Sequence, residues 1–193
     1  LIASETSKCF DEIFTLTYVT GRSVGIGAYL TKLGMRTIQK NDSPILLTGN
    51  KALNKVLGKD LYLDNLEIGG PDIMSVNSIS HKTVNTDEEG IKTIEKWLSF
   101  LKVEPYKFSE KKISFNVNKI DCLNEFFDKD SIFELFESWG GSILAGKARL
   151  NGFPITYLLC NDEMSITKIP IDPGDLKSEK YDKYNPGSVF NSD

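Results

Sequence analysis

Apolar and polar residues follow two different periods along this chain, and the periods predict a succession of helices and strands. "SETSKCFDEIF" has apolar side chains at helical spacing and predicts a helix over residues 3–12. "IFTLTYVT" alternates and is rich in β-branched residues, which predicts a strand over residues 13–19. From Ser23 the spacing becomes helical again until Gly34, a natural end for a helix. Strands that alternate with helices indicate an α/β architecture.

The alternation continues to about residue 101. "RTIQ" and "PILLTG" predict short strands, "KALNKVLG" predicts a helix that ends at Gly58, and "DLYLDNLEIGGPDIM" predicts an extended piece with a Gly-Gly-Pro turn. Residues 87–101 predict an amphipathic helix, whose apolar stripe is formed by Ile91, Ile94, Trp97, Leu98 and Leu101. We interpret the acidic run "TDEE" at its start as a capped helix start that complements the helix dipole, in preference to a metal site.

A charged, proline-interrupted stretch after Leu101 predicts a domain boundary. Beyond it the pattern predicts a helix (131–138), a strand (142–149), a turn at Asn151-Gly152 and a second strand (153–160). The final thirty or so residues, which include "PIDPGDLKSEKYDKYNPGSVFNSD", are expected to form surface loop. The predicted organisation is therefore a first domain (1–103), a linker (104–112) and a second domain (113–193).

Composition narrows the classes of partner. The 23 Lys and Arg residues against 27 Asp and Glu residues give a net charge of -4, which does not favour nucleic acid. The sequence contains no apolar run long enough for a membrane span. The three cysteines (Cys9, Cys122 and Cys160) are widely spaced, and the chain has a single histidine. We therefore expect reduced thiols in an intracellular protein and no zinc site.

The segment "TGRSVGIG" carries the strongest chemical signal. Its glycines lie where a strand ends and a helix begins, so bare backbone N–H groups meet at the positive end of a helix dipole. Two interpretations stay open from these residues alone, a tight structural turn and a site for an anion or oxyanion. Arg22 follows the strand directly, and its guanidinium suits a carboxylate or phosphate. We expect His81, the only imidazole, to make a structural hydrogen bond.

Several segments together exceed a generic α/β pattern. "SETSKCFDEIFTLTYVTGRSVGIGAYLTKLGMRTIQ", "PILLTGNKALNKVLGKDLY", "NLEIGGPDIM", "SHKTV" and "FFDKDSIFELFESWGGSILAGKARLNGFP" closely resemble the carboxyltransferase domain of eukaryotic-type multidomain acetyl-CoA carboxylase. The resemblance implies a crotonase-like ββα superhelix with parts of two related domains, the second half of an N-domain and the start of a C-domain.

The resemblance also implies a function. This family transfers a carboxyl group from carboxybiotin to acetyl-CoA, giving malonyl-CoA for fatty-acid synthesis, and backbone amides stabilise the thioester enolate. Gly25 and Ile26 match positions whose amides face the thioester oxygen, Arg22 matches an arginine near the acyl-CoA and carboxylate, and Tyr29 matches an aromatic residue of the pocket. Adding the residues expected to bind substrate, the candidate site comprises Arg22, Ser23, Gly25, Ile26, Gly27 and Tyr29, without a metal.

The implied partners are the biotin carboxyl carrier and biotin carboxylase domains of a longer parent chain, together with a second subunit in a head-to-tail homodimer. The implied compartment is the cytoplasm or the plastid. A Trp-Arg-Gly-Phe-Ser-Gly-Gly stretch of the family is absent here, so we expect the isolated chain to be inactive. A carboxylase for another acyl-CoA such as propionyl-CoA stays open, because one extra methyl group changes pocket discrimination little. A non-catalytic crotonase-like dimerisation module stays open because of the missing stretch and the departure at Ser78, and Ser4 and Lys8 are further departures from the family pattern.

Overall fold

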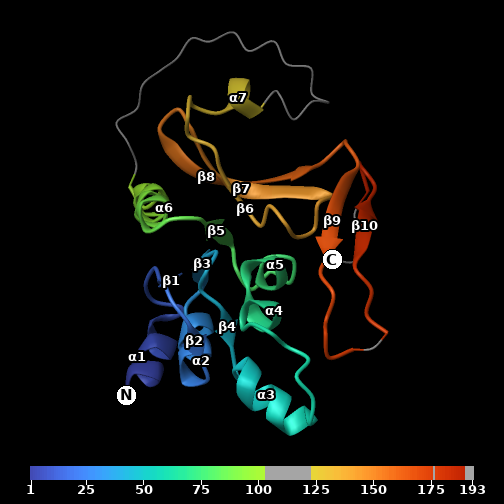
Figure 1. The fold of residues 1–193 in the computed structure, drawn as a ribbon. Coiled ribbons are helices and arrows are strands. Elements are labelled where there is room, and N and C mark those ends of the chain that lie inside the picture. Colours follow the sequence, from blue (N-terminus) through green and yellow to red (C-terminus); the bar gives the residue numbers. More distant parts are fainter. Residues whose placement is uncertain (103–122, 176, 190–193) are drawn as a thin grey trace. The chain divides into compact units, whose positions relative to one another are not determined.

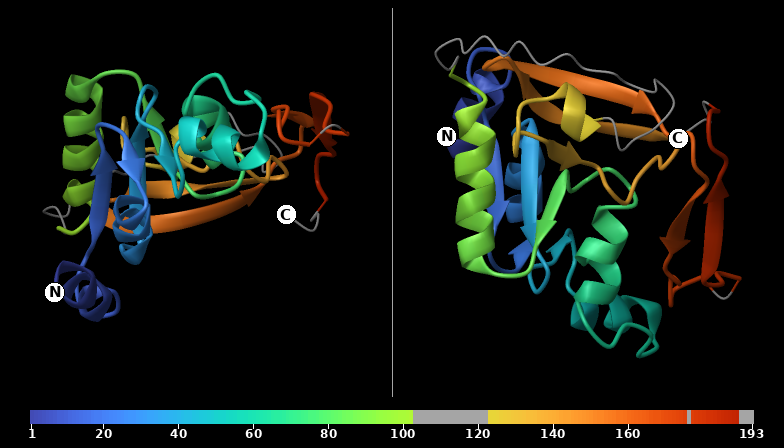
Figure 2. Two further views of the ribbon diagram at one scale, coloured as in Figure 1. Left: turned by 60° about the horizontal axis from the view of Figure 1, so that its bottom comes forward. Right: turned by 90° about the horizontal axis from the view of Figure 1, so that it is seen from above.

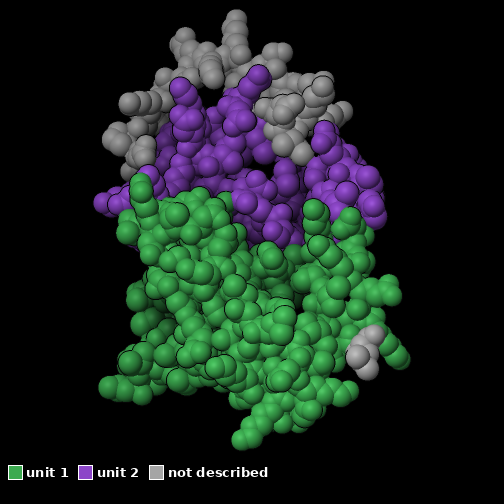
Figure 3. Space-filling view, viewed as in Figure 1, with its two compact units in different colours: residues 1–91, 168–183 green, residues 92–167, 184–193 purple. Residues whose placement is uncertain are grey.

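Two compact units make up the part of the chain that the computed structural model describes, which is residues 1–102, 123–175 and 177–189. Figure 3 colours unit 1 (1–91 and 168–183) green and unit 2 (92–167 and 184–193) purple. The predicted linker at 104–112 lies outside the described residues. The division of the chain into the two predicted domains therefore stays a prediction.

Unit 1 contains two small sheets, and the strands within each sheet are parallel (Figure 1). The larger is a three-stranded sheet in the order β1 (Leu16–Val19), β3 (Arg36–Lys40) and β5 (Lys82–Val84), which Figure 2 shows from two further directions. The smaller is the pair β2 (Ser23–Val24) and β4 (Ile45–Leu46). The middle strand β3 has no exposed surface at Thr37, Ile38 and Gln39, as expected for a parallel strand covered on both faces.

Six helices are described between the N-terminus and residue 99: α1 (Ile2–Cys9), α2 (Ile26–Leu33), α3 (Asn50–Leu57), α4 (Leu66–Gly69), α5 (Pro71–Met74) and α6 (Asp87–Ser99). The helices predicted at 3–12, in "KALNKVLG" and at 87–101 are confirmed by α1, α3 and α6. Helix α3 ends as predicted, because Gly58 adopts a left-handed conformation with φ 68°. The start predicted for α2 was too early, because Ser23 and Val24 pair with β4 as a strand.

The extended piece predicted before "GGPDIM" is wrong only in part, since residues 60–62 are irregular and the short helix α4 follows them; the predicted Gly-Gly-Pro turn leads from α4 into α5. The Glu67 carboxylate accepts hydrogen bonds from the N–H groups of Leu63 (2.6 Å) and Asp64 (3.3 Å), which holds the chain at the start of α4. Pro71 stands at the beginning of α5, where its missing N–H costs nothing. Local capping therefore outweighs the low helical propensity of the glycines.

The Gly-Gly pair in this segment has a packing role. A Cβ added to Gly69 would lie 1.9 Å from the Ile45 carbonyl oxygen, and one added to Gly70 would lie 2.5 Å from the Leu66 carbonyl oxygen. The backbone of α4 thus lies directly against β4. Only glycine allows this approach.

Unit 2 is built on an antiparallel sheet in the order β6 (Phe133–Leu135), β7 (Ile143–Leu150) and β8 (Phe153–Cys160), preceded by α7 (Leu123–Phe126). The two predicted strands and the turn between them are confirmed. Asn151 (φ 52°) and Gly152 (φ 82°) are the left-handed residues of a two-residue hairpin. A core cluster of Phe127, Ala148 and Tyr157 packs at this sheet.

Two predictions for residues beyond 130 are wrong. Residues 131–138 do not form a helix, because Phe133–Leu135 pairs with β7 and buries Phe133 and Leu135 on alternate positions. The expected C-terminal surface loop contains β10 (Tyr181–Asn185), which pairs with β9 (Ser165–Ile169). In both cases pairing with a strand distant in sequence decides the structure.

Helix α6 buries a different stripe from the predicted one. Thr93, Trp97 and Phe100 are buried, whereas Ile91, Leu98 and Leu101 expose 55%, 42% and 56% of their surface. Within unit 2 the Phe133 ring selects this face, since it lies 5.4 Å from Trp97 and 6.1 Å from Phe100 between ring centroids. Of the predicted stripe, Trp97 is buried and Ile94 is half-buried.

Candidate functional site

The backbone between β2 and α2 makes a turn that only glycine adopts readily. Gly25 has φ 58° and ψ −116°, a conformation strained for any residue with a Cβ. Hydrogen bonds to β4 hold the turn on both sides, because the Ser23 N–H donates to the Pro44 carbonyl (2.9 Å) and the Gly25 N–H donates to the Leu46 carbonyl (3.0 Å). The Gly25 amide is therefore already used within the fold.

The next two amides differ from that of Gly25. No side chain caps the N-terminus of α2, and the Gly25 carbonyl accepts from the N–H groups of Ala28 (3.0 Å) and Tyr29 (3.3 Å). No partner is recorded, within the described ranges, for the N–H groups of Ile26 and Gly27. They are first-turn donors at the positive end of an eight-residue helix.

The side chains around these donors are exposed. Ile26 and Tyr29 expose 67% and 59% of their surface, and Leu47, which follows β4, exposes 60%. Arg22 is exposed as well, and its guanidinium has no recorded contact with the residues that the structure describes. The turn thus presents two N–H donors, a free cation and apolar side chains on one short stretch of chain.

Ser23 and Gly27 have a different surrounding. The Thr31 hydroxyl lies 3.2 Å from the Ser23 hydroxyl and donates to the Gly27 carbonyl (2.9 Å). A Cβ on Gly27 would lie 3.1 Å from Ser23 Oγ, so this glycine makes room for the serine. The sequence analysis missed Thr31, although its spacing of four residues from Gly27 places it one helical turn away.

Comparison with known proteins shows which family the chain belongs to. The family model of the carboxyl transferase domain matches residues 1–164. The chain belongs to the carboxyl transferase family. It is 37% identical to acetyl-CoA carboxylase 2 of Oryza sativa subsp. japonica and 40% identical to the mitochondrial acetyl-CoA carboxylase of Saccharomyces cerevisiae (strain RM11-1a). Each alignment covers 98% of this carboxyl transferase chain but only 9% and 10% of those relatives.

Solved structures agree on the fold. Two structures of transcarboxylase 12S, one with methylmalonyl-coenzyme A and methylmalonic acid bound and one with hydrolysed methylmalonyl-coenzyme A, match with TM-scores of 0.68 and 0.69. Their sequence identities are 16% and 17%, over 81% of this chain and 34% of theirs. The predicted α/β class with a crotonase-like fold is confirmed.

His81 makes the predicted structural hydrogen bond. The Thr37 N–H donates to His81 Nδ1 (3.2 Å), and the His81 N–H of the backbone donates to the Thr37 carbonyl (3.0 Å). Burial, and then the charges of Lys32 and Arg36, lower the pKa of His81 to about 4. The imidazole is therefore neutral near pH 7 and accepts a backbone hydrogen bond.

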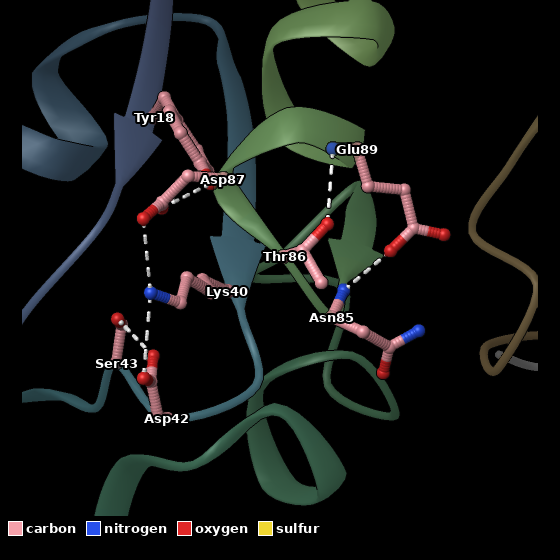
Figure 4. Close-up of polar contacts among 8 residues, drawn as sticks. All are labelled: Tyr18, Lys40, Asp42, Ser43, Asn85, Thr86, Asp87 and Glu89. Carbon is pink, nitrogen blue, oxygen red and sulfur yellow. Dashed lines mark hydrogen bonds and ion pairs between the residues drawn. The ribbon is translucent and has the colours of Figure 1, made fainter.

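The acidic run at the start of α6 behaves as predicted, as a helix start. The Glu89 carboxylate accepts from the Asn85 N–H (2.7 Å), and the Thr86 hydroxyl accepts from the Glu89 N–H (3.2 Å), a variant of the capping box in which the carboxylate reaches the residue before the N-cap. Figure 4 shows these bonds together with Lys40, whose ammonium lies 3.3 Å from Asp87 and 3.4 Å from Asp42. These contacts raise the pKa of Lys40, with the hydrogen bond to Asp87 as the largest cause.

Other chemical expectations have simpler outcomes. Cys9 and Cys160 are free thiols, as predicted, and Cys122 lies outside the described residues. Among the residues that the structure describes, no three His, Cys, Asp or Glu side chains gather in a way that could hold a metal ion. Within the same residues, no helix has the length and apolar character needed to cross a membrane.

Proposed function

We propose that this chain is part of an acetyl-CoA carboxylase and serves the transfer of a carboxyl group from carboxybiotin to acetyl-CoA, which gives malonyl-CoA. The observation that carries the proposal is the turn at the start of α2, where two N–H donors and the Arg22 guanidinium are left open. The names of the relatives, at 37–40% identity over almost the whole chain, support the same activity.

The open amides suit the charge that develops in this reaction. Transfer of a proton from the acetyl methyl group to the ureido nitrogen of biotin, free once its carboxyl group has left, would make an enolate whose negative charge gathers on the thioester oxygen. The N–H groups of Ile26 and Gly27, fixed at a helix N-terminus, would donate to that oxygen as its charge grows. Gly25, whose own N–H is bonded to Leu46, would act by setting the turn that aims the two donors.

The exposed side chains suit the remaining parts of the reactants. When bound, carboxybiotin supplies the carboxyl group, and the planar fork of Arg22 would hold a carboxylate through paired hydrogen bonds. Tyr29 and Ile26 offer apolar surface to the uncharged arm of the thioester. The Ser23 hydroxyl lies against Thr31, so its proposed part is to support the turn, with Gly27 beside it.

The proposal extends to the longer protein. The chain spans about a tenth of the length of the curated relatives that it matches. A biotin carboxylase domain and a biotin carboxyl carrier domain would load and deliver the carboxyl group, and a head-to-tail homodimer would complete the site, in the cytoplasm or the plastid. The yeast relatives are named as mitochondrial, so the compartment needs its own localisation experiment.

The test is carboxyl transfer by the full-length protein to acetyl-CoA and to propionyl-CoA, with Arg22→Ser beside the wild type. We expect transfer to acetyl-CoA and a loss of about 10- to 100-fold in kcat/KM for Arg22→Ser, the size of a lost charge-assisted hydrogen bond. Lys8→Ser is the matched control, since Lys8 is an exposed cation whose one recorded partner among the described residues is Glu5. Faster transfer to propionyl-CoA would reassign the substrate, and transfer to neither thioester would leave the dimerisation module.

A further inference from the structure

The two hydroxyls behind the turn have a defined direction of hydrogen bonding. Thr31 Oγ1 donates to the Gly27 carbonyl (2.9 Å), and a carbonyl oxygen can only accept. A hydroxyl has a single hydrogen, so Thr31 has none left for Ser23 at 3.2 Å. Ser23 is therefore the donor of that bond, and a relay runs from Ser23 through Thr31 to Gly27.

This relay links the two ends of the turn, because Ser23 precedes it and Thr31 lies in the helix that follows it. Ser23 is held on β4 through its own N–H (2.9 Å to Pro44), and its hydroxyl is held on α2 through Thr31. Thr31 exposes only 3% of its surface, so its bonds form away from solvent. The bond to the Gly27 carbonyl limits rotation about the Cα–C bond of Gly27, and we expect it to stiffen the first turn of α2, which carries the N–H groups of Ile26 and Gly27.

We propose that Thr31 is a positioning residue for carboxyl transfer, which acts through Ser23 and Gly27 to aim the open amides of α2. The proposal rests on the proposed function of these amides as donors to the thioester oxygen. Thr31 lies behind the turn and would not touch the substrate. The Ser23 hydroxyl, which the sequence analysis placed among substrate-binding residues, is part of the same device.

The fold supplies a matched control in Thr37. Both threonines are buried in unit 1, at 3% and 0% exposure, but the Thr37 hydroxyl has no hydrogen-bond partner among the described residues. Replacement by valine keeps the shape of each side chain and removes only the hydroxyl. Thr31→Val thus breaks the relay, whereas Thr37→Val breaks no bond that the structure records.

The experiment compares Thr31→Val, Thr31→Ser and Thr37→Val in the full-length protein. For Thr31→Val we expect kcat for transfer to acetyl-CoA to fall about tenfold with KM nearly unchanged, because misaimed donors lose contact only in the transition state. Thr31→Ser, which keeps the hydroxyl, should restore kcat to within about twofold of wild type, and Thr37→Val should also stay within about twofold. Equal kcat values for Thr31→Val and Thr37→Val would overturn the proposal.

Amide hydrogen exchange of residues 26–33 separates this proposal from the proposed function. Exchange in this segment should rise in Thr31→Val and not in Thr37→Val or Thr31→Ser, whether or not the wild type transfers carboxyl groups. If the wild-type protein transfers no carboxyl group but amide exchange is faster in Thr31→Val, the proposed function is refuted. The relay would then only stabilise the turn. Unchanged exchange in Thr31→Val would refute the relay itself.

Discussion

Two glycine turns of this chain treat their backbone donors in opposite ways. At the β7–β8 hairpin, the Asp128 carboxylate accepts from both the Asn151 N–H (2.8 Å) and the Gly152 N–H (2.7 Å). At the start of α2, no side chain caps the helix and the first two N–H groups have no recorded partner in the described part of the chain.

Under the proposed function, this difference separates a turn that serves the fold from a turn that offers its donors to a ligand. A closed pair of donors contributes to folding, since each charge-assisted bond is made within the fold. An open pair contributes nothing to folding and keeps its hydrogen-bonding capacity for a ligand. The presence of a glycine with positive φ does not distinguish the two turns, because Gly25 and Gly152 both have one.

Substitution of Gly25 should have the largest effect on activity. Alanine cannot adopt φ 58° with ψ −116° without strain, so Gly25→Ala should shift the turn and lower kcat of the full-length protein about 100- to 1,000-fold. Gly58→Ala is the control, because Gly58 also has positive φ but nothing lies within 4 Å of its added Cβ. Equal transfer rates in the two variants would show that the Gly25 turn has no part in catalysis.

Removal of Asp128 should affect folding and not chemistry. Asp128→Ala leaves two turn amides without their carboxylate, and we expect a loss of about 2–3 kcal/mol in the free energy of unfolding, measured by urea denaturation. Asp128→Asn keeps one oxygen and should lose less. A fall in carboxyl transfer per folded molecule, with stability unchanged, would reverse the assignment of the two turns.

The sequence predicts the closed turn better than it predicts the open one. "NG" between two apolar runs gives the hairpin directly, because left-handed φ values favour these residues. "TGRSVGIG" places the open turn between a strand and a helix, but the β2–β4 pairing that occupies the Gly25 amide joins residues about twenty apart. Only the structure shows that the Gly25 N–H is bonded within the fold and that no partner is recorded, among the described residues, for the N–H groups of Ile26 and Gly27.

The errors in the fold have the same cause. Residues 131–138 contain good helix formers, yet Phe133–Leu135 pairs with β7, and the aromatic ring of Phe133 then fixes the buried face of α6. A single sequence contains no record of such pairings. Local signals succeeded where caps and glycines decide the outcome, as at Gly58 and in the capping box at Glu89.

Acid should open one closed amide reversibly. The Thr37 N–H donates to neutral His81, whose pKa is lowered to about 4 from 6.5. Above pH 6.5 the His81 ring is neutral in both the folded and the unfolded protein, so its protonation takes nothing from the free energy of unfolding. Between pH 6.5 and 4 the unfolded chain takes up a proton first, so stability should fall, by about 2 kcal/mol once partial exposure of the ring is allowed for. The His81→Gln variant keeps an acceptor that does not titrate and should lose less stability over this range in urea titrations at each pH.

The smallest effect should follow from changing the side chain at the closed turn while keeping its amide. Asn151→Gly preserves the N–H that donates to Asp128 and tolerates φ 52°, so the free energy of unfolding should change by only about 0.5 kcal/mol. Urea midpoints of Asn151→Gly and Asp128→Ala measured side by side provide the test. A loss in Asn151→Gly as large as that in Asp128→Ala would mean that the asparagine side chain, and not the bonded amide, holds the hairpin, and the contrast between closed and open donors would lose its physical basis.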